Sequence, residues 1–122
     1  MKIILPIMKK WSDLIFEGKK KYELRKRLPE EITEVYVYES RGCGMIVGKL
    51  IVSSLYCLPL DKLWELTKDR NCVGKEDFKE YYTGKEKGVA IGIKEAILFP
   101  KPIPLSQFGF KTAPQNYYII EK

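Results

Sequence analysis

Hydrophobic side chains near the start of the chain recur at the spacing of an α-helix. Gly18 follows them and is a fitting C-terminal cap, so a helix is predicted at about residues 8–17. A short strand is predicted before it, at Lys2–Ile7. The apolar positions of the helical face are Met8, Trp11, Leu14 and Ile15.

After Gly18 the pattern changes to the period of a strand. Tyr22 and Leu24 alternate with Lys21, Glu23 and Arg25, which predicts one apolar and one charged face. Further strands are predicted at 35–38, 45–58, 88–98 and 115–121, and prolines at 100, 102 and 104 are expected to break regular structure.

Two short helices are predicted between the long strand at 45–58 and the strand at 88–98. One starts at Pro59 and carries Leu63 and Trp64, and the other spans Lys75–Tyr82. Several strands, one early helix and an inserted helical pair together predict an α+β fold, a curled β-barrel flanked by helices.

Composition fits this architecture. A chain of 122 residues with 45% hydrophobic residues is long enough for one domain, residues 1–122, with a real core. No window approaches the length of a membrane-spanning helix, and the start is too short for a signal peptide, so a cytoplasmic location is expected. We expect a monomer.

The residue types exclude several kinds of chemistry. The chain has no histidine, so Ser-His-Asp and Cys-His catalysis are excluded within it, and any proton transfer must use Lys, Glu, Asp, Tyr or Cys. The three cysteines form no CxxC pair, so we expect no metal site and no cofactor. Cys57 lies in an apolar run and is predicted to be in the core, whereas Cys43 is predicted to be exposed.

Positive charge is concentrated in one segment, Lys19–Arg27. It holds six basic residues and a single carboxylate, Glu23, within a chain of net charge +6. This arrangement favours a site for an anionic or polar ligand. The alternative is a basic, solvent-facing edge strand whose lysines deter aggregation. Glu23 and Arg25 share a face of the strand, which also fits an ordinary ion pair.

The order of motifs along the chain resembles the ASCH family (activating signal cointegrator homology), a branch of the PUA-like superfamily. The first motif is G-x-K-x-x-E-x-R at residues 18–25. The others, in order, are a strand at 35–40 that contains Tyr38, a glycine-containing strand at 46–52, a helical stretch at 76–84, Phe108-Gly109, and Pro-Gln-Asn-Tyr at 114–117. The resemblance implies a PUA-like pseudobarrel that binds RNA or a nucleotide-like ligand.

The resemblance also implies two enzymatic alternatives. Some ASCH-like proteins hydrolyse acylated cytidine with the G-x-K lysine, a hydroxyl residue three positions later and an acid on the inserted helix, and some are ribonucleases. Here Lys20 matches the lysine and Glu23 replaces the hydroxyl residue. Asp77, or else Glu76, would be the acid. A further alternative is a transcription coregulator module in which Trp64 and Phe78 anchor a protein partner.

Side chains elsewhere add polar and aromatic groups to the expected site. Tyr38 and Tyr117 could stack on a base, or simply pack in the barrel, and Gln115 and Asn116 could bond to base edges or form a turn. We expect Lys20, Glu23 and Arg25 to converge on a cleft between the N-terminal helix and the barrel. The catalytic candidates are Lys20, Glu23 and Asp77, and the ligand-binding candidates are Lys21, Arg25, Arg27, Tyr38, Ser40, Gln115, Asn116 and Tyr117.

Overall fold

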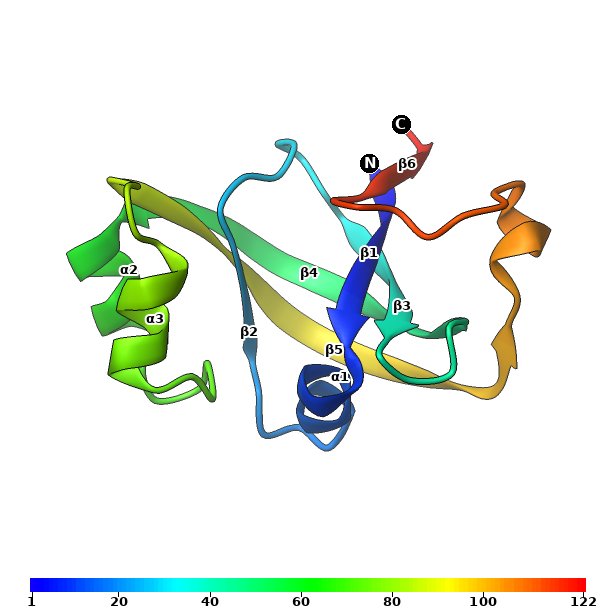
Figure 1. The fold of residues 1–122 in the computed structure, drawn as a ribbon, viewed down its shortest axis with the longest axis horizontal. Helices are drawn as coiled ribbons and strands as arrows, with labels where there is room; N and C mark the ends of the chain where they lie inside the picture. Colours follow the sequence, from blue (N-terminus) through cyan, green and yellow to red (C-terminus); the bar gives the residue numbers. More distant parts are fainter.

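Two long antiparallel strands, β4 (Ile46–Pro59) and β5 (Lys87–Ile103), run through the centre of the molecule (Figure 1). The computed structural model describes residues 1–122. Its six strands form one mixed sheet in the order β2-β5-β4-β3-β1-β6. The other strands are β1 (Lys2–Met8), β2 (Tyr22–Arg25), β3 (Glu34–Ser40) and β6 (Tyr118–Glu121).

Three α-helices lie against the sheet. Helix α1 (Lys9–Phe16) follows β1 directly, and the pair α2 (Leu60–Thr67) and α3 (Lys75–Tyr81) is inserted between β4 and β5 at one end of the sheet (Figure 1). A short 3-10 turn, Leu105–Phe108, follows β5. The predicted helices and strands are therefore all present. None of the helices combines the length and the apolar character that crossing a bilayer requires.

The sheet does not close into a ring of hydrogen-bonded strands. Strands β2 and β6 lie at the two ends of the order, and no pairing joins them. Strand β1 lies between β3, to which it is parallel, and β6, to which it is antiparallel. This pairing brings the two ends of the chain together, with Lys2 opposite Glu121 (Figure 1). The α+β class is confirmed, and the hydrogen-bonded pairing of the strands shows one mixed sheet without closure into a barrel.

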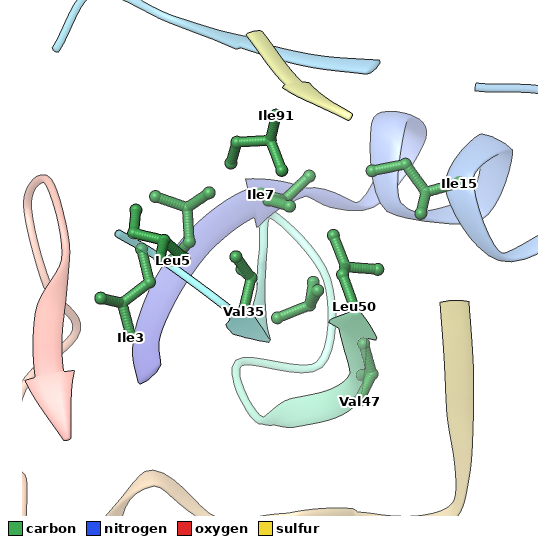
Figure 2. Close-up of a cluster of buried hydrophobic side chains, with 10 residues drawn as sticks. Ile3, Leu5, Ile7, Ile15, Val35, Val47, Leu50 and Ile91 are labelled. Atoms are coloured by element: carbon green, nitrogen blue, oxygen red, sulfur yellow. The ribbon is translucent and has the colours of Figure 1, made fainter. Parts of the chain in front are cut away.

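The largest core cluster lies between α1 and the strands (Figure 2). In β3, Val35 and Val37 point into it, while Tyr36 and Tyr38 point to the opposite face, as the strand period of two requires. Its buried members are Ile3, Leu5, Ile7, Ile15, Ile32, Val35, Val37, Val47, Leu50 and Ile91.

Two smaller clusters complete the core. The helical cluster fastens α2 and α3 to the sheet, and the aromatic cluster fills the other face near the 3-10 turn. The buried members of the helical cluster are Leu24, Leu63, Phe78, Tyr82 and Ala90. The aromatic cluster is built on Ile4, Ile46 and Leu105, with Tyr36, Tyr38, Phe99, Phe108, Phe110 and Tyr118 among the rings around it.

Two predictions about local structure were wrong. Strand β5 continues through Pro100 and Pro102 to Ile103, because the pairing jumps from Gly48–Leu98 to Ile46–Ile103 and leaves the prolines in a bulge that needs no N–H donors. Cys57 is exposed rather than buried. Its neighbours Tyr56 and Leu58 pack against the helical cluster, so alternation along β4 turns Cys57 outward.

Candidate functional site

The end of helix α1 fixes the position of Lys20. Gly18 has a φ of +82°, a left-handed conformation that favours glycine. Its N–H donates to the Ile15 carbonyl at 3.0 Å, and the Lys19 N–H donates to the Leu14 carbonyl at 3.0 Å. This pair of bonds is a Schellman motif. It reverses the chain and delivers Lys20 to the base of β2.

Lys20 is a buried lysine, with only 2% of the residue exposed. Its Nζ donates to the carbonyl oxygen of Asn71, lies 3.7 Å from Glu23 Oε1, and sits 5.0 Å from the centre of the Trp11 ring. Burial lowers the pKa of Lys20, and this effect outweighs the opposite influence of the Glu23 carboxylate. Lys20 therefore loses its proton more readily than a surface lysine does.

Glu23 joins two cations on the wall of the site. It is 5% exposed, and its Oε2 accepts bonds from Arg25 Nη2 at 2.8 Å and from Arg25 Nε at 3.2 Å, while its Oε1 faces Lys20. Arg25 Nη2 also donates to the carbonyl oxygen of Pro6 in β1 at 2.6 Å. Of the charged face predicted for this strand, Glu23 is therefore buried and Arg25 is half-buried, and the two are paired, whereas Lys21 at its start is exposed.

The loop after α2 covers this charged group. Asn71 is fully buried, its Nδ2 donates to Thr67 Oγ1 at 3.1 Å, and its Oδ1 accepts the Val73 N–H at 2.7 Å. These bonds hold the Asn71 carbonyl against Lys20. The inserted helical pair thus contributes directly to the site.

A cleft of about 600 Å³ opens beside these residues. Its lining combines segments that are distant in the sequence, from α1, β1, β2, α3 and the stretch before β6. Six of the predicted site residues line it: Lys20, Glu23, Arg25, Ser40, Asp77 and Gln115. Asp77 rather than Glu76 borders the cleft.

The remaining predicted residues lie elsewhere. Arg27, Asn116 and Tyr117 line a neighbouring pocket that shares only Arg25 and Tyr81 with the cleft. Lys21 is exposed and lines neither pocket. Tyr38 packs against the aromatic cluster on the other face of the sheet, because it follows Val37 in the alternation of β3.

The cleft contains side chains that the site prediction did not include. Trp11 and Tyr81 line it, and Asn71 supports it from behind. Trp11 belonged to the apolar face of the predicted helix, so its use as a cleft wall had no separate signal in the sequence. The Asn71 contact is made by a backbone carbonyl, which no residue type reveals.

The site offers groups for polar recognition and for proton transfer. Lys20 is an amine of lowered pKa, Glu23 is held between two cations, and Asp77 is a second, exposed carboxylate on the rim. No group of three or more His, Cys, Asp or Glu side chains is arranged to hold a metal ion. Lys20, Glu23 and Asp77 can form hydrogen bonds and ion pairs, and they can take part in acid–base chemistry.

Comparison with solved structures decides the fold. The crystal structure of the ASCH protein from Zymomonas mobilis superposes with a TM-score of 0.86, covering 97% of this chain and 87% of that one at 19% identity. The chain has the ASCH fold. Two single-substitution variants of the same Zymomonas protein match the ASCH fold of this chain with TM-scores of 0.85 and 0.86, at 19% and 18% identity. The comparison confirms the fold that the resemblance implied.

Comparison with known sequences says less about this chain than comparison with solved structures does. No protein-family model matches this ASCH-fold chain. Large ribosomal subunit protein uL22 from Ureaplasma parvum serovar 3 is 22% identical over 91 residues, or 75% of this chain. The chain spans only 29% of the length of that relative.

Proposed function

We propose that this ASCH-fold domain binds RNA or a nucleotide-like ligand in the cleft beside Lys20, Glu23 and Arg25. The observation that supports this proposal is a group of three paired charges on the wall of a cleft of about 600 Å³, in which Lys20 and Glu23 are buried and Arg25 is partly exposed. Desolvating charges is costly, and an ion-pair group that served stability alone would be replaced by apolar side chains at little loss. A polar ligand gives such a group a use.

The charged group keeps capacity for a ligand. Arg25 directs Nε and Nη2 at protein acceptors, while its Nη1 bonds to no protein atom. The only buried side-chain polar atom without a partner is Ser12 Oγ, so Arg25 Nη1 must reach solvent. A carboxylate oxygen can accept more than one hydrogen bond, so Glu23 also keeps capacity to accept bonds from a ligand. Donors and acceptors of both kinds are what the edges of nucleobases require.

A binding titration tests this proposal. Arg25→Ala should weaken the binding of single-stranded RNA by about tenfold or more, because a charge-assisted donor at the ligand is removed. Fluorescence anisotropy with a labelled RNA oligomer measures the change, and a thermal melt reports whether the fold persists. Arg70→Ala removes the same charge from an exposed residue that lines neither pocket, and it should bind like the unmodified protein.

Arg25→Lys provides a second variant should Arg25→Ala fail to fold. It retains the positive charge beside Glu23 but loses the planar fork that holds both the carboxylate and the Pro6 carbonyl. Unchanged affinity for every RNA and nucleotide tested, in a folded Arg25 variant, would contradict the proposal.

A second candidate function is hydrolysis of a modified nucleoside or of RNA. The observation that favours it is Lys20, whose lowered pKa makes the neutral amine more available for taking a proton. Its neighbour Glu23 is 3.7 Å away, and Asp77 on the rim would be the acid partner. Arg25 would stabilise developing negative charge through its unpaired Nη1.

Incubation with N4-acetylcytidine and, separately, with RNA distinguishes the two reactions. Lys20→Ala should abolish whichever activity is found, and Lys19→Ala should retain it, since Lys19 is an exposed neighbour paired with Glu17. Preparing all proteins identically controls for contaminating nuclease. Undiminished turnover by Lys20→Ala would remove Lys20 from the mechanism.

The packing of the inserted helices counts against the protein-interaction alternative. Trp64 is half-buried and meets Phe78 edge-on, with ring centres 5.1 Å apart, and Phe78 continues the contact to Tyr82 at 4.9 Å. Both proposed anchors are thus used to fasten α2 and α3 to the sheet.

A further inference from the structure

A second hollow, of about 660 Å³, adjoins the cleft. Three separate segments build it: the connection after β2, the end of α3 with the turn beyond it, and the stretch before β6. We call it the basic pocket. Its lining residues are Arg25, Lys26, Arg27, Leu28, Pro29, Tyr81, Lys85, Asn116 and Tyr117.

The basic pocket is positively charged and has no acidic lining residue to neutralise it. Four of its lining residues are cations. Lys26, Arg27 and Lys85 take part in none of the ion pairs of the protein, although seven other basic residues do. Unpaired cations gathered in a concave surface focus a positive potential there, which attracts an anion.

Two residues connect the basic pocket to the cleft. Arg25 and Tyr81 line both hollows. The Nη1 group of Arg25 has no protein partner, and the ring of Tyr81, which is 40% exposed, carries the Lys26 ammonium 5.0 Å from its centre. A ligand in the cleft can therefore extend past Arg25 and Tyr81 into the basic pocket and remain in contact with the protein.

We infer that the basic pocket binds a phosphate group of the ligand whose base lies in the cleft. This inference rests on the proposed function and narrows it: the ligand is a nucleotide, either a free phosphate monoester or a phosphodiester of RNA, rather than a free nucleoside. Arg25 Nη1, Lys26 and Lys85 supply the charge-assisted donors that phosphate oxygens accept. Tyr81 offers an exposed ring at the junction, where a base can stack.

The alternative to a phosphate site is that these lysines are ordinary solvated side chains on the surface. Such lysines need not line a common hollow, adjoin a charged cleft or have an ammonium group packed on an aromatic ring. The basic pocket has all three. The two interpretations differ in what happens to ligand affinity when the lysines are removed, since a phosphate site adds affinity only for phosphorylated ligands.

Calorimetric titration with a matched set of ligands tests the inference. The probes are the four ribonucleosides, their 5′- and 3′-monophosphates, and a short single-stranded RNA oligomer. The proteins are the unmodified chain, the double variant Lys26→Ala/Lys85→Ala, and the control Lys101→Ala/Lys111→Ala. The control loses the same charge from exposed residues that line neither pocket.

We expect a monophosphate or the oligomer to bind the unmodified protein about tenfold or more tightly than the nucleoside does. Lys26→Ala/Lys85→Ala should abolish this gain and leave nucleoside affinity unchanged, while the control keeps it. For the oligomer, the dependence of log K on log salt should become shallower by about one for each phosphate that the variant no longer neutralises. A gain with monophosphates indicates a terminal phosphate, and a gain with the oligomer alone indicates a backbone phosphodiester.

Two results would overturn the inference, and they are distinguishable. Equal affinity for nucleosides and phosphorylated ligands, or a gain that survives in Lys26→Ala/Lys85→Ala, refutes the phosphate site and leaves the proposed function standing. Failure of every nucleoside, nucleotide and oligomer to bind refutes the proposed function, and the phosphate site with it.

Discussion

Replacing Lys20 by methionine should remove part of the rise in unfolding free energy that the protein shows as the pH increases. Methionine keeps most of the length of the side chain but cannot bind a proton. In the folded protein burial lowers the pKa of Lys20 from its usual value of 10.5, whereas in the unfolded chain the side chain is solvated. Between the folded and unfolded pKa values the unfolded state binds more protons, so the free energy of unfolding rises with pH. Lys20→Met removes this contribution.

The size of this change in unfolding free energy follows from the difference between the folded and unfolded pKa values of Lys20. Each unit by which the folded pKa is lowered adds about 1.4 kcal/mol to the stability of the unmodified protein, relative to Lys20→Met, as pH rises to 10.5. The difference at neutral pH combines opposing effects. The variant deprives the Asn71 carbonyl of its donor, which costs about 1–3 kcal/mol, but it also removes the cost of burying an ammonium. The change with pH is therefore the informative quantity.

Urea denaturation of both proteins between pH 7 and pH 10.5 measures the difference. Other groups that titrate in this range are common to both proteins and cancel. Lys19→Met serves as the control, because Lys19 is exposed and its removal should leave the difference flat. The difference in unfolding free energy between the unmodified protein and Lys20→Met should rise with pH. If it stays constant or falls, burial does not lower the pKa of Lys20.

Three further substitutions test the local structure by urea denaturation. Gly18→Ala should cost about 1 kcal/mol of unfolding free energy, because alanine tolerates the φ of +82° poorly, and an unchanged stability would mean that the helix end relaxes. Tyr82→Phe should cost about 1 kcal/mol, since the Tyr82 hydroxyl donates to the Arg25 carbonyl at 2.9 Å; an unchanged midpoint would show that water replaces it. Gly48→Ala should cost more than either, about 2 kcal/mol or beyond, because its Cβ would collide with the Ile97 carbonyl and the Phe16 ring, and a stable variant would contradict that close approach.

Periodicity was sufficient to predict the elements of the fold. The spacing of Trp11, Leu14 and Ile15 predicted α1, and alternation predicted β3. Periodicity did not predict that β5 continues through Pro100 and Pro102. The register shift that leaves these two prolines unpaired depends on the opposite strand. Closure of the sheet also depends on strand pairing between distant segments, which local sequence does not encode.

The candidate site was predictable where its residues lie close together in the sequence. The spacing of Lys20, Glu23 and Arg25 placed them together, and the structure brings them onto one cleft wall. The spacing did not reveal that Glu23 is buried, since a charged face normally points to solvent. The division of the basic segment between two hollows arises from the course of the chain after Arg25.

An NMR titration shows directly whether the cleft binds a nucleotide-like ligand. The backbone amide signals of ¹⁵N-labelled protein would be followed as single-stranded RNA and mononucleotides are added. If the cleft and the basic pocket bind the ligand, the shifts should concentrate on the residues around Trp11, Glu23 and Asp77 and extend to Lys26 and Lys85. They should also saturate as ligand is added. An absence of shifts, or shifts confined to the far end of the molecule at Lys101–Lys111, would contradict that binding.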